Sequence, residues 1–344
     1  MSEQAKAVPP RSGPIRWINA LSIDAVAVGI VWQAIFACAF RGSPPSLIES
    51  TTLGLTLWLI YTADHLLDAT RLDIHQPRTF RHHIHHQYRH VLVVVWMVFT
   101  VIDAAAIVVG LSESLIRWGL ALAAIVLLYG ASVHFRSTAA ALESETASPP
   151  NRRSIHRKGR FAIGKEIKVG GIFALGVGLL AWDHQPTLPL MVSTALAAVL
   201  FAANCVVVAC WDTDCDRSQN FESWTSRRPN ILGWMTPTLI VLGCGSMASS
   251  FVFAIPPLVA GSIAISSLSL LAAWVWTGAT AGRRAAGRSK DDQRTSPQTG
   301  QTVPHQVSPA PSPSMAWLAD AMLIAPPAFV WLVFLGWSAI GWLA

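Results

Sequence analysis

The sequence predicts an all-α, polytopic membrane protein with nine transmembrane helices. Of its 344 residues, 52% are hydrophobic and only 13% are charged, and its mean hydropathy is +0.45. Soluble domains carry about 25% charged residues. In addition, apolar stretches recur along the chain at lengths that can cross about 30 Å of hydrocarbon. Together these observations exclude an ordinary soluble globular protein.

The predicted helices follow a polar, proline-containing tail at residues 1–16, which we expect to be cytoplasmic. Residues 17–344 then form one transmembrane domain. In chain order, the predicted helices occupy residues 17–40, 47–68, 91–111, 114–134, 166–182, 188–211, 231–254, 257–279 and 316–343. Two of the links are very short, one from Leu111 to Ser114 and the other the Pro256-Pro257 turn, so boundaries there are the least sharply defined.

Lys and Arg residues predict the orientation of the chain. With the N-terminus in the cytoplasm, every Lys and Arg lies on the cytoplasmic side except Arg41 and Arg117. The C-terminus is then outside, and a bacterial inner (plasma) membrane fits best. The same asymmetry explains the net charge of +6 without a nucleic-acid partner.

Two polar stretches are predicted to be disordered cytoplasmic loops, near residues 137–157 and 283–313. Both contain too few apolar side chains to pack against a core. They are interpreted as linkers between predicted helices.

Two acidic clusters lie at corresponding ends of the second and sixth predicted helices. The first comprises Asp64 and Asp68, and the second comprises Asp212, Asp214 and Asp216. Residues four apart share a helix face, so each cluster offers two carboxylates to one ligand. Magnesium suits such sites because it binds a few carboxylates together with water and phosphate oxygens. The alternative is that these are interfacial charges paired with neighbouring arginines.

These clusters resemble the two aspartate-rich motifs of the UbiA-type intramembrane prenyltransferases. The second family motif reads approximately DxxYAxxDxxDD, and CVVVACWDTDCD matches it at Ala209, Asp212 and Asp216, with Asp214 one place before the penultimate Asp. The first reads NDxxDxxxD, and IYTADHLLD keeps Asp64 and Asp68. The resemblance implies a nine-helix bundle that transfers a prenyl group from a prenyl diphosphate to a lipophilic acceptor within membrane lipid. It also implies Mg²⁺ bound by both motifs. The spacing between the motifs matches two four-helix repeats.

The chain departs from the family pattern at several positions. Ile60 and Tyr61 replace the leading Asn and Asp of the first motif, and Val208 replaces the Tyr of the second. Asn204 lies one place before the second motif's leading Asp and offers a compensating polar group. We expect Tyr61 and Asn204 to bind substrate. A non-catalytic member of the same fold is also consistent with the altered first motif.

Basic side chains flank both clusters. Arg71 and the segment RHHIHHQYRH follow the first cluster, where the family carries a cap over the substrate. Lys165 and Lys168 precede the fifth predicted helix, where a basic residue of the family contacts diphosphate. Arg71, Lys165 and Lys168 are therefore candidate diphosphate ligands. The histidine-rich segment is interpreted as a solvated cationic cap, and a transition-metal site is the alternative.

Three further acids lie within predicted helices, at Asp24, Asp103 and Asp320. Intramembrane carboxyl groups favour a functional role, although each could instead hydrogen-bond a neighbouring helix. A rival function is an ion-coupled membrane transporter whose carboxylates bind a cation or a proton. Acidic clusters at helix ends, instead of mid-membrane, favour the transferase.

Overall fold

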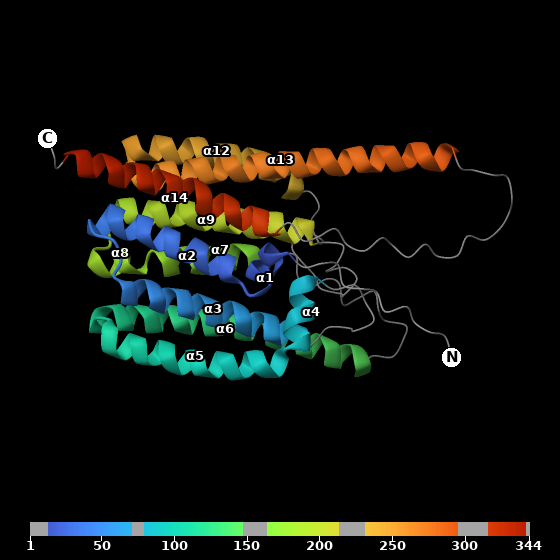
Figure 1. The fold of residues 1–344 in the computed structure, drawn as a ribbon, viewed down its shortest axis with the longest axis horizontal. Coiled ribbons are helices and arrows are strands. Elements are labelled where there is room, and N and C mark those ends of the chain that lie inside the picture. Colours follow the sequence, from blue (N-terminus) through green and yellow to red (C-terminus); the bar gives the residue numbers. More distant parts are fainter. Residues whose placement is uncertain (1–12, 71–78, 147–163, 213–230, 295–315, 342–344) are drawn as a thin grey trace.

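The computed structural model describes residues 13–70, 79–146, 164–212, 231–294 and 316–341, and all regular secondary structure in these ranges is helical. The helices form an elongated bundle, with the short α4 lying across one end (Figure 1). Their bounds are α1 Pro14–Ala20, α2 Ile23–Phe36, the π-helical η1 Ala37–Arg41, α3 Leu47–Ala69, α4 Phe80–Gln87, α5 Arg89–Gly110, α6 Glu113–Thr146, α7 Lys165–Val177, α8 Leu179–His184, α9 Leu188–Trp211, α12 Ile231–Val252, α13 Pro257–Arg294 and α14 Ala316–Gly341.

Within the described residues, six helices are long and apolar enough to cross a membrane, judged by length and composition. They comprise Ile23–Arg41, Arg89–Gly110, Glu113–Ser132, Leu188–Trp211, Gly233–Val252 and Pro257–Gly278. These six confirm the all-helical polytopic class. Helices α3, α7 and α14 run alongside them in the bundle (Figure 1), but nine spans and an internal repeat remain predictions.

The first predicted helix, residues 17–40, is wrong as a single straight element. Ser22 adopts a left-handed backbone conformation with φ of 57°, which ends α1 before α2 begins. The side chain of Asn19 spans this break, because its Nδ2 donates to Asp24 Oδ2 at 2.6 Å. The break therefore fixes Asp24 in the first turn of α2.

The fifth predicted helix, residues 166–182, is also divided. Gly178 separates α7 from α8, and its carbonyl oxygen accepts hydrogen bonds from the N–H groups of both Ala181 and Trp182. Glycine favours such an interruption because it stabilises a helix interior less than alanine does, by about 1 kcal/mol.

Part of each predicted disordered linker is helical. Helix α6 continues to Thr146 and α13 to Arg294. Segment 137–146 contains Ala and Glu, and segment 283–294 contains Ala, Arg and Lys, all residues of high helix propensity that favour extending a helix. The remainder of each predicted linker lies outside the described residues.

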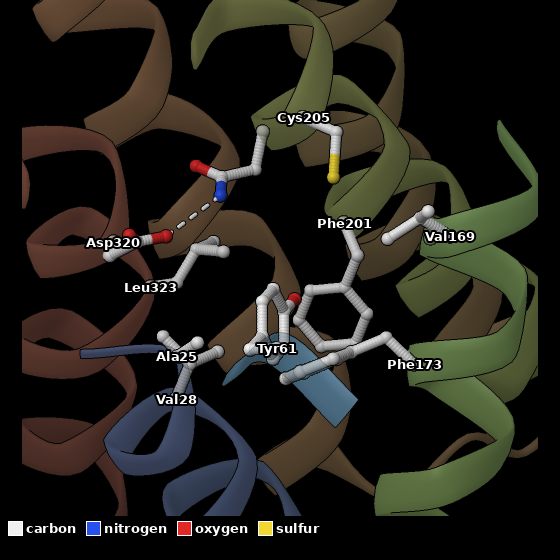
Figure 2. Close-up of a pocket in the computed structure, with 11 residues that line it drawn as sticks. Ala25, Val28, Tyr61, Val169, Phe173, Phe201, Cys205, Asp320 and Leu323 are labelled. Atoms are coloured by element: carbon white, nitrogen blue, oxygen red, sulfur yellow. Dashed lines mark hydrogen bonds between the residues drawn. The ribbon is translucent and has the colours of Figure 1, made fainter. Parts of the chain in front are cut away.

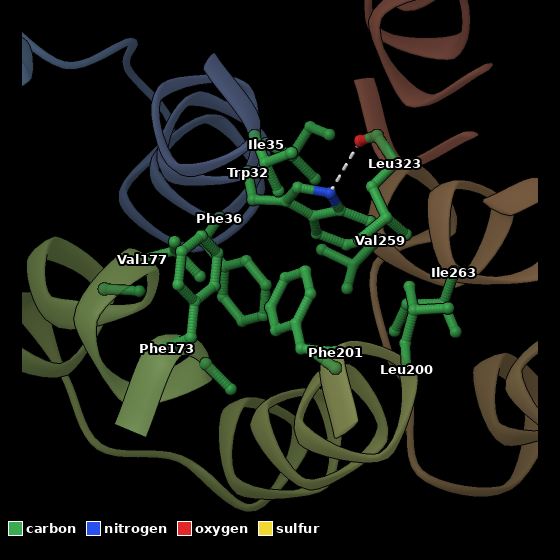
Figure 3. Close-up of a cluster of buried hydrophobic side chains, with 14 of the residues drawn as sticks. Trp32, Ile35, Phe36, Phe173, Val177, Leu200, Phe201, Val259, Ile263 and Leu323 are labelled. Carbon is green, nitrogen blue, oxygen red and sulfur yellow. Dashed lines mark hydrogen bonds between the residues drawn. The ribbon is translucent and has the colours of Figure 1, made fainter. Parts of the chain in front are cut away.

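The core joins helices that are distant in the sequence. Trp32 of α2 packs edge-on against Phe201 of α9 at 5.3 Å between ring centroids, and Phe173 of α7 packs against Phe201 at 4.8 Å. The indole N–H of Trp32 donates to the carbonyl oxygen of Leu323 in α14 at 3.0 Å (Figure 3). Since Trp32 is fully buried, this bond satisfies a donor that would otherwise be stranded in the core.

Helices α7 and α9 approach very closely at Gly170. A Cβ atom at this position would lie 2.8 Å from the carbonyl oxygen of Ala198 and closer still to the backbone nitrogen of Ala202. Small residues permit this approach, as they do in many membrane helix pairs. The contact fixes the spacing of α7 and α9 where both line the cavity described below.

Candidate functional site

Helix α4 covers the end of the bundle at which α3 and α9 both finish (Figure 1). Thr79 caps it by accepting a hydrogen bond from the N–H of His82, and Phe80 packs edge-on against Trp17 of α1 at 5.5 Å. His82, Ile84 and His85 are buried, with exposed fractions of 4%, 4% and 1%. The predicted solvated cap is therefore wrong in one respect: it is an amphipathic helix with one buried face.

Buried histidines connect α4 to α3. The rings of His65 and His85 pack edge-on at 5.1 Å, and His85 Nδ1 lies 3.0 Å from the carbonyl oxygen of Arg81. Burial, followed by the nearby Arg81 charge, lowers the pKa of His82 to about 3. Burial also lowers the pKa of His85. Neutral imidazoles are thus the forms that dock α4 at neutral pH.

Arg81 connects α4 to the second acidic segment. Its guanidinium lies 4.0 Å from Asp212 Oδ2. Asp212 follows the last turn of α9, and its side chain is only 11% exposed. Burial raises the pKa of Asp212, although the Arg81 charge opposes that shift. The fold therefore gives this carboxylate a cationic neighbour from a helix that packs against α3.

The first acidic segment lies nearby, on the last two turns of α3. Asp64 is exposed and Asp68 is partly exposed, and the charge of Asp64 raises the pKa of His82 against the larger effects that lower it. Asp64 and Asp212 thus both act on α4. Arg71, Asp214 and Asp216 lie outside the described residues, so their predicted roles remain predictions.

The two predicted lysines occupy different positions on α7. Lys165 and Lys168 are both exposed, but only for Lys165 does the structure give an electrostatic influence on the site, acting on His82 of α4 and Cys205 of α9. Glu166, between them, is 3% exposed. It shares a helix face with Gly170, four residues on, which is the face packed against α9.

A small cavity of about 30 Å³ lies among α2, α3, α7, α9 and α14, close to this end of the bundle (Figure 2). Its polar lining comes from four side chains, Tyr61, Asn204, Cys205 and Asp320. Its apolar lining includes Phe173 and Phe201. Tyr61 and Asn204, the two residues outside the acidic and basic groups that were predicted to bind substrate, thus line one cavity although they are on different helices.

Asp320 lines this cavity, and Asp24 lies near enough to act on it electrostatically. Asn204 Nδ2 donates to Asp320 Oδ1 at 3.0 Å, and Asn19 holds Asp24 from the other side. Asp103 differs, because its carboxyl group accepts a hydrogen bond from Thr56 on a separate helix pair, α3 and α5. Of the three intramembrane acids, Asp320 therefore lines the cavity, Asp24 lies near Asp320, and Asp103 lies elsewhere in the bundle.

The described carboxylates fit magnesium only as part of a site completed by a phosphate ligand. No three His, Cys, Asp or Glu side chains lie close enough to hold a metal within the described ranges. Mg²⁺ commonly binds one or two carboxylates plus substrate phosphates and water. Asp64 and Asp68 share a helix face at the end of the bundle that α4 covers, which we call the rim. They supply such a pair of hard oxygen ligands.

Sequence reasoning did not identify Glu166, Cys205 or the individual importance of Arg81. Glu166 was detectable in principle, since it precedes Gly170 by one helical turn on a small-residue face. Arg81 was not distinguishable among the arginines of its segment, because its ion pair with Asp212 depends on how α4 folds back over the bundle.

Comparison of the chain with protein-family models, curated proteins and solved structures gives no significant match. The resemblance to UbiA-type prenyltransferases therefore rests on the aspartate-rich segments alone.

Proposed function

We propose that this protein transfers a prenyl group from a prenyl diphosphate to a lipophilic acceptor within the membrane. The observation that carries the proposal is that α4 lies next to both acidic segments, because it packs against α3 and its Arg81 lies against Asp212. Asp64 and Asp68 come from α3, Asp212 from α9, and Arg81 of α4 lies against Asp212. Facing acidic and basic groups at a membrane boundary suit a metal-bound diphosphate.

In this proposal the basic groups bind phosphate and the acidic groups bind the metal. Lys165, Arg81 and the predicted Arg71 contact phosphate oxygens, whereas Asp64, Asp68, Asp212 and the predicted Asp214 and Asp216 hold Mg²⁺. When bound, Mg²⁺ would neutralise the charge that develops on the departing diphosphate. The prenyl chain lies along apolar helix faces, because the cavity of about 30 Å³ is too small for it.

The acid residues should make metal and substrate binding interdependent. Few carboxylates remain in the first motif, so the metal depends on phosphate oxygens for part of its coordination shell. Mg²⁺ and farnesyl diphosphate should therefore bind cooperatively, each weakly alone.

Titration of the purified protein with farnesyl diphosphate, with and without Mg²⁺, tests this proposal. We expect Asp212→Asn to weaken binding only when Mg²⁺ is present, and Lys165→Ala to weaken it in both conditions. Binding that is independent of Mg²⁺ and insensitive to Asp212→Asn would contradict the proposal.

One observation favours the rival, an ion-coupled transporter. The bundle contains helices interrupted at Ser22 and Gly178, and two acids of the bundle, Asp24 and Asp320, lie near the first interruption. Interrupted helices and buried acids are typical of ion-coupled carriers. Proton uptake into proteoliposomes that requires Asp24 and Asp320, combined with no binding of farnesyl diphosphate, would favour this function.

A further inference from the structure

The cavity near the rim is lined by polar and apolar groups from several helices. Tyr61 of α3, Cys205 of α9 and Asp320 of α14 provide polar groups, and Phe173 and Leu323 are among the apolar ones. Figure 2 shows these side chains around one space. A lining of this kind suits a small polar group that is attached to an apolar body.

Asp320 is held in place by a neighbouring amide and can still accept a further hydrogen bond. Asn204 is 8% exposed, and its Nδ2 donates to Asp320 Oδ1 at 3.0 Å. A carboxyl group has several lone pairs, so one bond from an amide leaves room for a second donor. The Tyr61 side chain lines the same cavity, and its hydroxyl group can both donate and accept. A ligand in the cavity can therefore meet one acceptor and one group of either kind.

The size of the cavity limits what can enter it. Its volume of about 30 Å³ accommodates about one or two water-sized groups. A hydroxyl group and the carbon atom that carries it meet this limit, whereas an aromatic ring exceeds it. The rest of such a ligand has to lie along apolar helix faces outside the cavity.

The cavity lies close to both acidic helix ends. Tyr61 precedes Asp64 by three residues on one face of α3, a rise of about 4.5 Å. Cys205 precedes Asp212 by seven residues, and Asp212 follows the last turn of α9, so the rise there is about 10 Å. A hydroxyl group in the cavity would thus face the first carbon of a prenyl chain whose diphosphate is bound at the rim.

We propose that this cavity is the acceptor subsite of the transferase, and that the acceptor is a neutral lipophilic molecule with a hydroxyl group. This inference deepens the proposed function and rests on it. The hydroxyl group donates to the Asp320 carboxyl group and accepts from Tyr61, and Asn204 positions Asp320 for this contact.

Other small head groups fit these partners less well. An ether or a ketone accepts hydrogen bonds but donates none, so the Asp320 carboxyl group would gain no donor from it. An ammonium group is strongly hydrated in water, and its burial therefore carries a large desolvation cost. A hydroxyl group both donates and accepts without a charge, which matches Asp320 and Tyr61 together.

The test measures binding of octanol to the full chain in lipid nanodiscs, by equilibrium dialysis with radiolabelled octanol in the absence of farnesyl diphosphate and Mg²⁺. Empty nanodiscs are measured in parallel, so that partition of octanol into lipid is subtracted. Octyl methyl ether and octylamine are then added as competitors. We expect saturable octanol binding, with the ether competing at least about tenfold more weakly because it cannot donate to Asp320. Octylamine should also compete more weakly than unlabelled octanol.

Two variants assign the contacts. Asp320→Leu should bind octanol and octyl methyl ether equally, because only the hydroxyl group donates to Asp320. Tyr61→Phe should weaken both ligands by about fivefold and keep their ratio, because both accept from Tyr61. The matched controls are Asp103→Leu, at a buried acid that accepts from Thr56, and Tyr88→Phe, at an exposed tyrosine. Both controls should retain the wild-type affinity and selectivity.

Octanol binding no greater than that of empty nanodiscs overturns the inference alone, because farnesyl diphosphate binding is measured separately. Equal affinity of the wild type for octanol and its ether, or tighter binding of octylamine, also overturns it. If Asp320→Leu does not fold, the wild-type competition series and Tyr61→Phe still test the inference. A wild-type protein that binds octanol as expected but does not bind farnesyl diphosphate with Mg²⁺ overturns the proposed function and, with it, the acceptor role of the cavity.

Discussion

The acidic residues occupy two regions with opposite surroundings. At the rim, Asp64 is exposed, and Asp212 lies near the Arg81 guanidinium at 4.0 Å. In the cavity, Asp320 accepts a hydrogen bond from Asn204, and nearby Asp24 accepts one from Asn19. The acids at the rim lie near solvent and the Arg81 guanidinium. The deeper acids instead accept hydrogen bonds from neutral asparagine side chains.

The surroundings of a carboxyl group therefore change with its depth in the bundle. A carboxylate near solvent and a guanidinium suits a metal ligand, whereas the deeper carboxyl groups are held by hydrogen bonds from neighbouring asparagines. Only a few helical turns separate the two regions.

The largest effect is expected from separating the helices that hold the cavity. Gly170→Ala places a Cβ atom against the backbone of α9, 2.8 Å from the Ala198 carbonyl oxygen. Overpacking of this kind costs about 1–3 kcal/mol, so thermal unfolding in detergent should begin at a clearly lower temperature. Gly171→Ala is the matched control, because its Cβ would meet nothing within 4 Å. Equal stability of the two variants would contradict the close α7–α9 contact.

The next effect is a loss of α4 docking in acid, which acts on the rim and leaves the cavity in place. The folded state lowers the pKa of His82 from 6.5 to about 3 and lowers that of His85 as well. The unfolded or undocked state therefore binds more protons, and the stabilisation present above pH 6.5 is lost as pH falls towards 3.

Hydrogen exchange of residues 80–87 measured across this pH range tests the effect. We expect protection to decrease below pH 6.5 in wild type. His82→Gln should make the decrease shallower, whereas His83→Gln, at an exposed position, should leave it unchanged. Protection that is constant across the range would show that neutral imidazoles do not hold α4.

Much of the helical plan was predictable, because long apolar runs identify helices by their length. The breaks at Ser22 and Gly178 were not, since neither residue interrupts the apolar pattern, and the helical ends of α6 and α13 follow local propensity, not hydrophobicity. At the site, the sequence identified Tyr61, Asn204 and all three intramembrane acids. It could not show that Asp24 and Asp320 lie near each other, because that depends on how α2 and α14 pack together.

A smaller effect should distinguish the two candidate lysines at the rim. Lys165 lies within electrostatic reach of His82 and Cys205, and no such influence is seen for Lys168. We expect Lys165→Ala to weaken farnesyl diphosphate binding by about tenfold, as loss of one charge-assisted hydrogen bond does. Lys168→Ala should change binding by less than about twofold. Equal effects from the two variants in the same titration would remove the assignment of Lys165 as a phosphate ligand.

A double-mutant cycle on farnesyl diphosphate binding tests most directly whether the two acidic helix ends form one site. Affinities are measured with Mg²⁺ for wild type, Asp64→Asn, Asp212→Asn and the double variant. Residues that share a ligand cluster couple by about 0.5–3 kcal/mol, so the double variant should bind more tightly than the product of the single losses predicts. The coupling should disappear without Mg²⁺. Strictly additive losses in the presence of Mg²⁺ would contradict a shared metal–diphosphate site.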